Sequence, residues 1–186
     1  MPRLNLNGMR TKIMMIMTIL TTSCENPAFM EIMGSEDVHI KEINYTALPN
    51  LPIDERGYYH LELMDSWQTI HTIGGVLYRG DDITNGVNVV KTAWQGNMYW
   101  VYGDYECYIK VVDNIGYSNC VNYDYQPEWL VPTVNGSAYS REDGSVNQTI
   151  GPVRNMRGDT LQIITKWYDD WTSTEGTSEP LYIILD

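Results

Sequence analysis

Short runs of alternating apolar and polar residues cover much of the chain from residue 37 onward. The segment Tyr-Tyr-His-Leu-Glu-Leu at 58–63 places Tyr59, Leu61 and Leu63 on one face and polar groups on the other. This period of two is typical of a β-strand with one buried face and one solvated face. The same pattern predicts strands over residues 38–45, 58–63, 68–78 (bent at Gly74-Gly75), 87–94, 98–102, 106–112, 119–125, 161–168 and 181–185. The apolar phase changes near Glu42, which predicts a β-bulge there.

Gly, Asn and Asp stand in nearly every gap between these runs, as turns require. No stretch has an amphipathic helical period of useful length, so the pattern predicts an all-β fold, an antiparallel β-sandwich. Residues 37–125 carry most of the predicted strands, and Pro127 and Pro132 bracket a candidate internal boundary. Residues 126–186 either complete the same sandwich or form a small second β unit, and we favour completion.

The N-terminus has a basic start at Arg3, Arg10 and Lys12, then an apolar run over residues 13–20, then Thr-Thr-Ser before Cys24. This order is that of a secretory signal peptide, and the run is far shorter than the roughly 20 residues of a membrane-spanning helix. The small residues before Cys24 resemble the lipobox of bacterial lipoproteins. The resemblance implies a signal peptide over 1–23, acylation of Cys24, and a lipid-anchored tether over 24–36. It also implies a place in the bacterial cell envelope, either periplasmic or on the cell surface.

The chain is acidic, with a formal net charge of −12 from 12 Lys and Arg against 24 Asp and Glu. Removal of residues 1–23 takes away three basic residues and no acidic one, which leaves 9 against 24 and a charge of −15. Such a surface repels phosphate backbones, so we expect no nucleic-acid partner. It also repels anionic lipid headgroups, so membrane attachment is expected through the lipid on Cys24 alone.

Two of the cysteines flank a predicted hairpin. If Asp113-Asn114 is a two-residue turn, Val112 lies opposite Ile115 and, counting outward, Cys107 lies opposite Cys120. Directly opposed side chains have Cβ atoms about 4.5–5.5 Å apart, and exported proteins meet oxidising conditions, so the spacing predicts a Cys107–Cys120 disulfide. A four-residue loop over 113–116 would instead place Cys107 opposite Asn122.

The run Tyr-x-x-x-Val-x-Asp-Asn-x-Gly from Tyr108 onward resembles the last hairpin of bacterial immunoglobulin-like domains. The resemblance covers residues 108–117 and implies an immunoglobulin-like arrangement of the sandwich. About 60 residues follow this hairpin, and the predicted disulfide would lie within one sheet rather than between two, which departs from that pattern.

Catalytic motifs are few. The histidines, His39, His60 and His71, do not form a zinc-helix motif, and no Gly-x-Ser-x-Gly elbow or phosphate loop occurs. His60 and Glu62 share a strand face on which a metal site could begin, but a solvated face explains them better. A carboxylate-dependent hydrolase needs only two acids across a sugar; its candidates are Glu62, Asp65, Asp81, Asp82, Asp169 and Asp170.

Two kinds of ligand suit the remaining residues. We expect no cofactor, with calcium as the one candidate ion. Calcium prefers oxygen ligands, and turn-like segments supply them at Asp81, Asp82, Asp169 and Asp170. The aromatic residues, 14 Tyr and 6 Trp against one Phe, favour half-exposed faces. Trp94, Trp100 and Trp171 are the candidates for a ligand platform.

These observations together predict a non-enzymatic, lipid-anchored binding or adhesion module for a glycan or a protein. Two alternatives remain open. One is an assembly subunit that donates the apolar strand 181–185 to a neighbouring chain, and the other is the carboxylate-dependent hydrolase.

Overall fold

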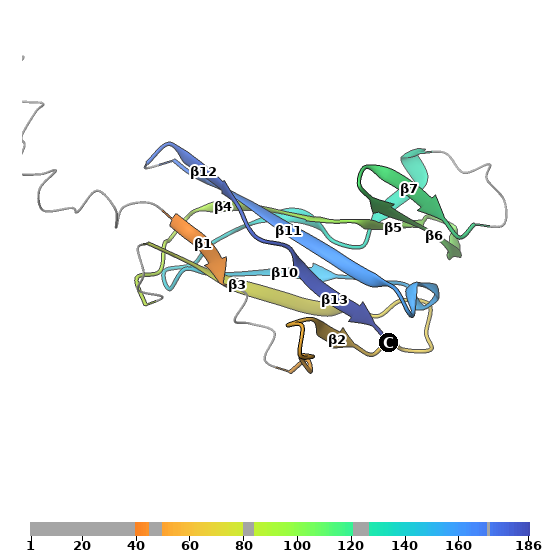
Figure 1. Cartoon of the computed structure of the whole chain (residues 1–186). Coiled ribbons are helices and arrows are strands. Elements are labelled where there is room, and N and C mark those ends of the chain that lie inside the picture. The colour runs from red at the N-terminus through yellow and green to blue at the C-terminus, as the bar shows by residue number, and fades with distance from the viewer. Residues whose placement is uncertain (1–39, 45–49, 80–83, 121–126, 171) are drawn as a thin grey trace, which may run out of the picture. The chain divides into compact units, whose positions relative to one another are not determined.

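The computed structural model describes residues 40–44, 50–79, 84–120, 127–170 and 172–186 (Figure 1). The predicted signal peptide over 1–23, the lipidation site Cys24 and the tether over 24–36 lie outside the described residues. So do Asp81, Asp82 and Trp171. The part of the chain that is described from Ile40 to Asp186 belongs to one unit, His39–Asp186.

The protein is an all-β sandwich, as the alternating pattern predicted. One sheet has the order β1 (Ile40–Asn44), β3 (His71–Arg79), β10 (Ser145–Ile150). A second has the order β2 (Tyr59–Leu61), β13 (Leu181–Leu185), β11 (Thr160–Asp169), β4 (Lys91–Gly96), β9 (Asn135–Tyr139), and β12 (Thr174–Thr177) also pairs with β11. A third has the order β7 (Ile115–Ser118), β6 (Asp104–Val112), β5 (Met98–Val101), β8 (Leu130–Pro132). Two short 3₁₀ helices, η1 (Pro127–Trp129) and η2 (Arg154–Met156), interrupt the strands.

The core lies between the first two sheets, which we call the body. Along β11 burial alternates strictly, so that Leu161, Ile163 and Trp167 point inward while their neighbours face outward. The pairs are antiparallel except for β2 with β13, which run parallel. Because β13 lies between β11 and β2, its apolar side chains Leu181, Ile183 and Leu185 are buried in the same core.

The third sheet, β5–β8, continues from the body, and we call it the extension. Only Asn97 separates β4 from β5, so one line of chain pairs first with β9 and β11 and then with β8 and β6. The Asn97 side chain accepts a hydrogen bond from the Gln162 N–H at 2.9 Å, and its backbone carbonyl accepts one from the Val111 N–H at 2.7 Å. Asn97 thus ties β11 of the body to β6 of the extension.

The structure confirms one predicted detail of the strands and corrects two others. The bulge near Glu42 is confirmed by the register shift between Ile40 and Ile43. The predicted bend at Gly74-Gly75 does not interrupt the strand, because β3 pairs with β10 in unbroken register through both glycines. The strand expected over 87–94 begins only at Lys91, since Val89 has a φ of 60° and cannot continue a strand.

The sequence pattern missed most strands after residue 126. β9, β10 and β12 are mostly polar and β8 has only three residues; the strands β8, β9, β10 and β12 pair with β5, β4, β3 and β11 respectively. Every one of these partners except β11 lies before residue 126. Residues 127–186 therefore contribute to all three sheets of the one sandwich.

The predicted hairpin is confirmed at the level of register. Asp113 and Asn114 have φ values of 50° and 63°, as a type I′ turn requires, and Val112 lies opposite Ile115. Cys107 and Cys120 form a disulfide with their Cα atoms 4.6 Å apart. That separation is the one expected for a directly opposed, non-hydrogen-bonded pair in an antiparallel ladder.

Candidate functional site

The structure separates the predicted platform tryptophans. Trp94 is 1 % exposed and lies in the core, where its indole N–H donates to Thr92 Oγ1 at 3.0 Å. Its position on the inward face of β4 leaves no ring face for a ligand, which removes it from the predicted platform. Trp171 lies outside the described residues. Trp100 is also mostly buried, but it lies beneath exposed aromatic side chains.

Trp100 is the base of an aromatic cluster on the extension. The Trp67 ring meets it edge to face, with centroids 5.9 Å apart, and the Tyr102 ring lies 6.5 Å away on the same strand line. Trp67 is 46 % exposed and Tyr102 is 68 % exposed. Edge-to-face and offset contacts at such distances are favourable in themselves, so Trp100 holds the exposed rings in place.

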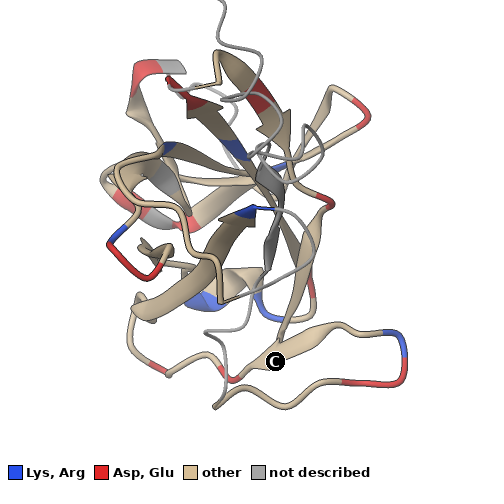
Figure 2. Ribbon diagram, turned by 90° about the vertical axis from the view of Figure 1, so that its left-hand side faces the viewer, with Lys and Arg blue, Asp and Glu red and all other residues tan. Residues whose placement is uncertain are grey.

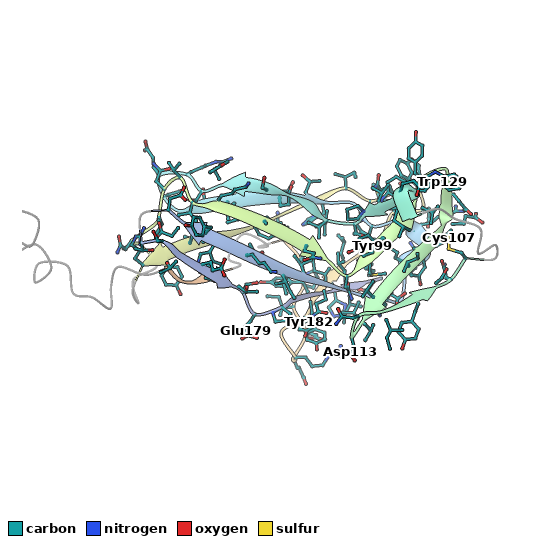
Figure 3. The ribbon with its side chains drawn as sticks, turned by 90° about the horizontal axis from the view of Figure 1, so that it is seen from above. Tyr99, Cys107, Asp113, Trp129, Glu179 and Tyr182 are labelled. Atoms are coloured by element: carbon teal, nitrogen blue, oxygen red, sulfur yellow. A yellow bond between two sulfur atoms is a disulfide. The ribbon has the colours of Figure 1, made fainter. Side chains whose placement is uncertain are left out.

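Trp129 extends the cluster across the sheet. β5 and β8 pair in regular register, with Trp100 opposite Val131 and Val101 opposite Leu130. The Tyr102 N–H donates to the Trp129 carbonyl at 2.8 Å, which continues that register by one residue. Opposed residues share a face of an antiparallel sheet. We call Trp67, Trp100, Tyr102 and Trp129 the aromatic patch; Trp129 lies at the end of the molecule that carries the disulfide (Figure 3).

Backbone hydrogen bonds fix the segment that supplies Trp67. The Arg154 N–H donates to the Trp67 carbonyl at 3.1 Å, and the Thr69 N–H donates to the Pro152 carbonyl at 2.9 Å. Gln68 forms an isolated β-bridge with Val153. The exposed indole therefore stands on an anchored backbone, even though residues 62–68 form no strand.

The charged groups of the neighbouring strand are mostly acidic. Glu106 forms an exposed ion pair with Arg154, 2.9 Å apart, and Asp104 accepts from the Glu106 N–H at 3.2 Å. Asp and Glu are spread over several turns and strand ends of the molecule (Figure 2). A patch of aromatic faces with carboxylates nearby suits a neutral ligand that offers both C–H surfaces and hydroxyl donors.

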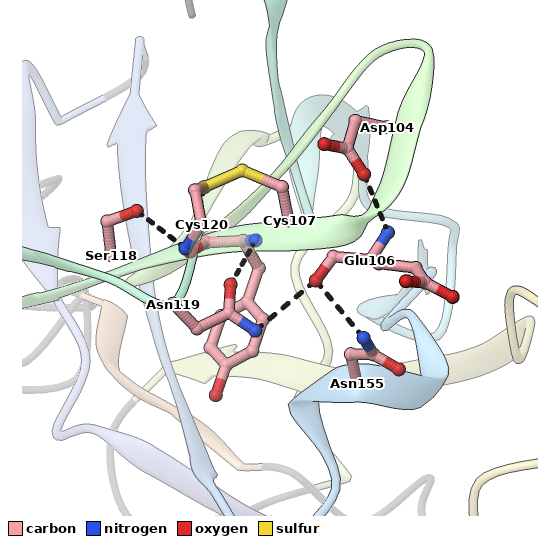
Figure 4. Close-up of a disulfide and its surroundings, with 8 residues drawn as sticks. Asp104, Glu106, Cys107, Ser118, Asn119, Cys120 and Asn155 are labelled. Atoms are coloured by element: carbon pink, nitrogen blue, oxygen red, sulfur yellow. Dashed lines mark hydrogen bonds between the residues drawn. A yellow bond between two sulfur atoms is a disulfide. The ribbon is translucent and has the colours of Figure 1, made fainter. Parts of the chain in front are cut away.

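The disulfide packs with Val101 and Leu130 and holds the base of the β6–β7 hairpin (Figure 4). Between β7 and Cys120, the Asn119 N–H donates to the Tyr108 carbonyl at 3.2 Å, and the Asn119 side chain adds two further hydrogen bonds to β6. Its Oδ1 accepts from the Tyr108 N–H at 2.7 Å, and its amide donates to the Glu106 carbonyl at 3.3 Å. Asn155 of η2 donates to that same carbonyl at 3.1 Å.

The candidate calcium ligands are only partly described. Asp169 is buried, and Arg79 Nη1 lies 2.7 Å from its Oδ2, so a protein cation already occupies that carboxylate. Asp170 is exposed, and Asp81 and Asp82 lie outside the described residues. Within the described ranges, no group of three or more His, Cys, Asp or Glu side chains could hold a metal ion. Calcium binding stays a prediction.

The remaining hydrolase candidates fall at a different place. Glu62 and Asp65 both line a cavity of about 280 Å³ beside Arg157. The Asp65 side chain is fully exposed and pairs with Arg157 at 3.5 Å. The carboxylate-dependent hydrolase stays a prediction.

His60 is engaged by carboxylates rather than by Glu62. Its Nδ1 lies 2.7 Å from Asp186 Oδ2, and its Nε2 lies 3.8 Å from Asp54 Oδ2. The Tyr58 N–H, together with Arg56, stabilises the Asp54 carboxylate and lowers its pKa to about 2. This cluster joins β2 to the end of β13.

The C-terminal strand is paired within its own chain. β13 has β11 on one side and β2 on the other, so intermolecular donation of residues 181–185 would require its release from the core. The structure therefore offers no support for the assembly alternative.

Sequence reasoning missed three of the four patch residues, Trp67, Tyr102 and Trp129. The spacing of Trp100 and Tyr102, two residues apart in a strand, was a usable signal that both lie on one face. Trp67 and Trp129 carried no such signal, because they reach the patch only through tertiary pairing.

Comparison of the sequence with known protein families finds no match, and comparison with curated proteins finds none either. In the part of the chain that is described, no helix is long and apolar enough to cross a membrane.

Proposed function

We propose that this protein is a non-enzymatic binding module of the bacterial cell envelope, anchored by lipid on Cys24, whose aromatic patch binds a glycan. The observation that carries the proposal is the exposure of Trp67, Tyr102 and Trp129 on a rigid base. Exposed indole rings held in fixed positions offer flat apolar faces at little entropic cost on binding.

The charge of the protein supports a neutral ligand rather than an anionic one. The formal net charge of the chain is −12, and Arg154, whose backbone N–H bonds the Trp67 carbonyl, is paired with Glu106. A neutral glycan avoids this repulsion and offers its C–H faces to the rings.

The position of the patch also supports a binding role. β1, where the described chain begins, and the extension lie at opposite ends of the body (Figure 1).

Affinity electrophoresis of the full-length protein in gels containing neutral polysaccharides tests the glycan proposal. We expect one polysaccharide to retard the wild type, and Trp129→Ala and Trp67→Ala to abolish most of the retardation. Tyr139→Ala is the matched control, because Tyr139 is 61 % exposed but lies on β9 of the body. Equal retardation of the patch variants and the wild type would refute the proposal.

The anchor is tested separately by metabolic labelling with an alkyne-bearing fatty acid in a bacterial host. We expect the wild type to incorporate label and Cys24→Ser to incorporate none. An unlabelled wild type would refute lipid anchoring and leave the glycan proposal untouched.

A further inference from the structure

A cavity of about 290 Å³ opens where the extension bends away from the body. Its polar lining comes from Gln95 of β4, Tyr99 of β5, the turn residues Asp113 and Asn114, and Gln162 of β11. Tyr99 lies on β5 and Asp113 lies in the turn between β6 and β7 (Figure 3). The volume lies at the lower limit of about 300 Å³ for small-molecule pockets, which suits a ligand of one or two rings.

This cavity is distinct from the aromatic patch. Tyr99 and Trp100 are successive residues of β5, so their side chains point to opposite faces of the sheet. Tyr99 pairs with Ile109 and Pro132, whereas Trp100 pairs with Tyr108 and Val131. The extension thus has the patch on one face and the cavity on the other.

The polar side chains of the cavity are available to a ligand. Those of Gln95, Tyr99, Asp113, Asn114 and Gln162 make no hydrogen bond or ion pair with any described residue. By contrast, Asn97 at the back of the cavity is fully engaged, since it accepts from Gln162 N–H and donates to the Val111 carbonyl at 3.4 Å. Two glutamines, an asparagine, a phenol and a carboxylate therefore stand around a fixed frame.

Contacts within the protein itself hold this frame in place. Val111 and Asn97 are joined by a backbone hydrogen bond, and the turn that carries Asp113 and Asn114 is closed by the Val112–Ile115 pair. The disulfide holds the other end of the same hairpin. A preorganised set of donors and acceptors lowers the entropic cost of binding.

The chemistry of the lining selects the ligand class. Amide and phenol groups both donate and accept, which matches hydroxyl groups, and Val111 and Ile164 add apolar wall for C–H surfaces. The lining has no basic residue, which disfavours an anion, and its single carboxylate is too few for calcium, which takes six to eight oxygens. We propose that this cavity binds one neutral sugar unit, a terminal or side-branch residue, independently of the aromatic patch.

The test is a nuclear magnetic resonance titration of the ¹⁵N-labelled full-length protein. Glucose, galactose, mannose, N-acetylglucosamine and cellobiose are each added up to tens of millimolar, with the side-chain amides of Gln95, Asn114 and Gln162 as reporters. We expect one sugar to shift these signals saturably, and Gln95→Ala or Gln162→Ala to weaken that binding about tenfold. Asp113→Asn keeps a residue that tolerates the positive φ and removes only the charge.

Matched variants make the result decisive. Asn147→Ala removes an exposed amide on β10, far in the fold from the cavity, and is expected to leave the affinity unchanged. Trp129→Ala is expected to leave it unchanged as well, so failure here and failure of the patch are distinguishable.

Three results would overturn the proposal. They are the absence of saturable shifts with every sugar, an affinity unaffected by both glutamine variants, and loss of binding in Trp129→Ala. Calcium chloride that shifts the same amides in place of any sugar would also overturn it, because the site would then be a cation site.

Discussion

The body and the extension of this protein are each stabilised by a different set of interactions. The body has a contiguous core that includes fully buried Ile73, Leu77, Leu161, Ile163 and Ile183. The separate apolar cluster of the extension is small: Val101, Cys107 and Cys120, with Leu130 against them. The extension also inserts Met98 and Trp100 of β5 into the core of the body, and a disulfide and polar contacts supplement these apolar contacts.

The polar ties run from the extension to the segment around η2. Asp159 accepts hydrogen bonds from the Tyr108 hydroxyl and from Lys110 Nζ, the latter at 2.8 Å. Arg154 and Asn155 of η2 both contact Glu106. These polar ties join the extension to the segment that follows β10, in addition to its apolar contacts with the body.

The largest expected effect is in the body. Ile163→Ala should lower the free energy of unfolding by about 2–5 kcal/mol, since it leaves a cavity on a central strand. The control Ile115→Ala, at an exposed position near the hairpin tip, should change it by at most about 0.5 kcal/mol. Urea denaturation measures both. Equal losses would contradict the contrast; if Ile163→Ala does not fold, Ile163→Val should still cost about 0.5–1.5 kcal/mol.

The disulfide should act mainly on the extension. The two cysteines are 13 residues apart. In the chain-entropy model, loss of the disulfide that closes a loop of this size lowers the free energy of unfolding by about 3 kcal/mol. In Cys107→Ala/Cys120→Ala we therefore expect amide hydrogen exchange in β6 and β7 to rise by about a hundredfold. Exchange in β11 should rise far less. An equal rise in both regions would mean that the extension and the body unfold as one unit.

Asp159 should contribute a smaller amount. Asp159→Asn removes the charge that accepts from Tyr108 and Lys110, and we expect a loss of about 1–2 kcal/mol, because the pair is partly exposed. Asp104→Asn, on the same extension but with one exposed contact, is the control and should lose at most about 0.5 kcal/mol. Chemical denaturation at neutral pH compares them, and a loss no larger than that of the control would remove Asp159 as a tie.

The smallest effect concerns alkaline pH. Burial, together with the hydrogen bond to Asp159, raises the pKa of the Tyr108 phenol above its ordinary value of 10.0. Its contribution to stability is therefore fully present below pH 10 and is lost as the pH rises beyond that value. We expect Tyr108→Phe to flatten the fall of the unfolding midpoint between about pH 10 and pH 12. Tyr117→Phe, at an exposed residue, should leave the slope unchanged, and identical slopes in all three proteins would contradict the assignment.

Local patterns predicted the parts of the fold whose reasons are local. Alternation predicted β2, β11 and β13, because each must bury one face, and the Asp113-Asn114 turn fixed the pairing of Cys107 with Cys120 by counting. The polar strands β9, β10 and β12 and the three-residue β8 gave no such signal, since their partners rather than their own side chains make them strands. For the candidate sites, Trp94 and Trp100 were both expected on a ligand platform and both are buried, because a strand pattern does not say which face becomes the core.

The sequence by itself determined the all-β class, the hairpin register and the acidic charge, because these follow from spacing along a few residues or from composition. Only the tertiary structure decided that Trp67 and Trp129 meet near Trp100, and that Gln95 and Gln162 share a cavity with Asp113. These groups come from strands far apart in the chain. Their meeting depends on which strands pair and where one strand line bends between two sheets, and long-range pairing of this kind leaves no local mark on the sequence.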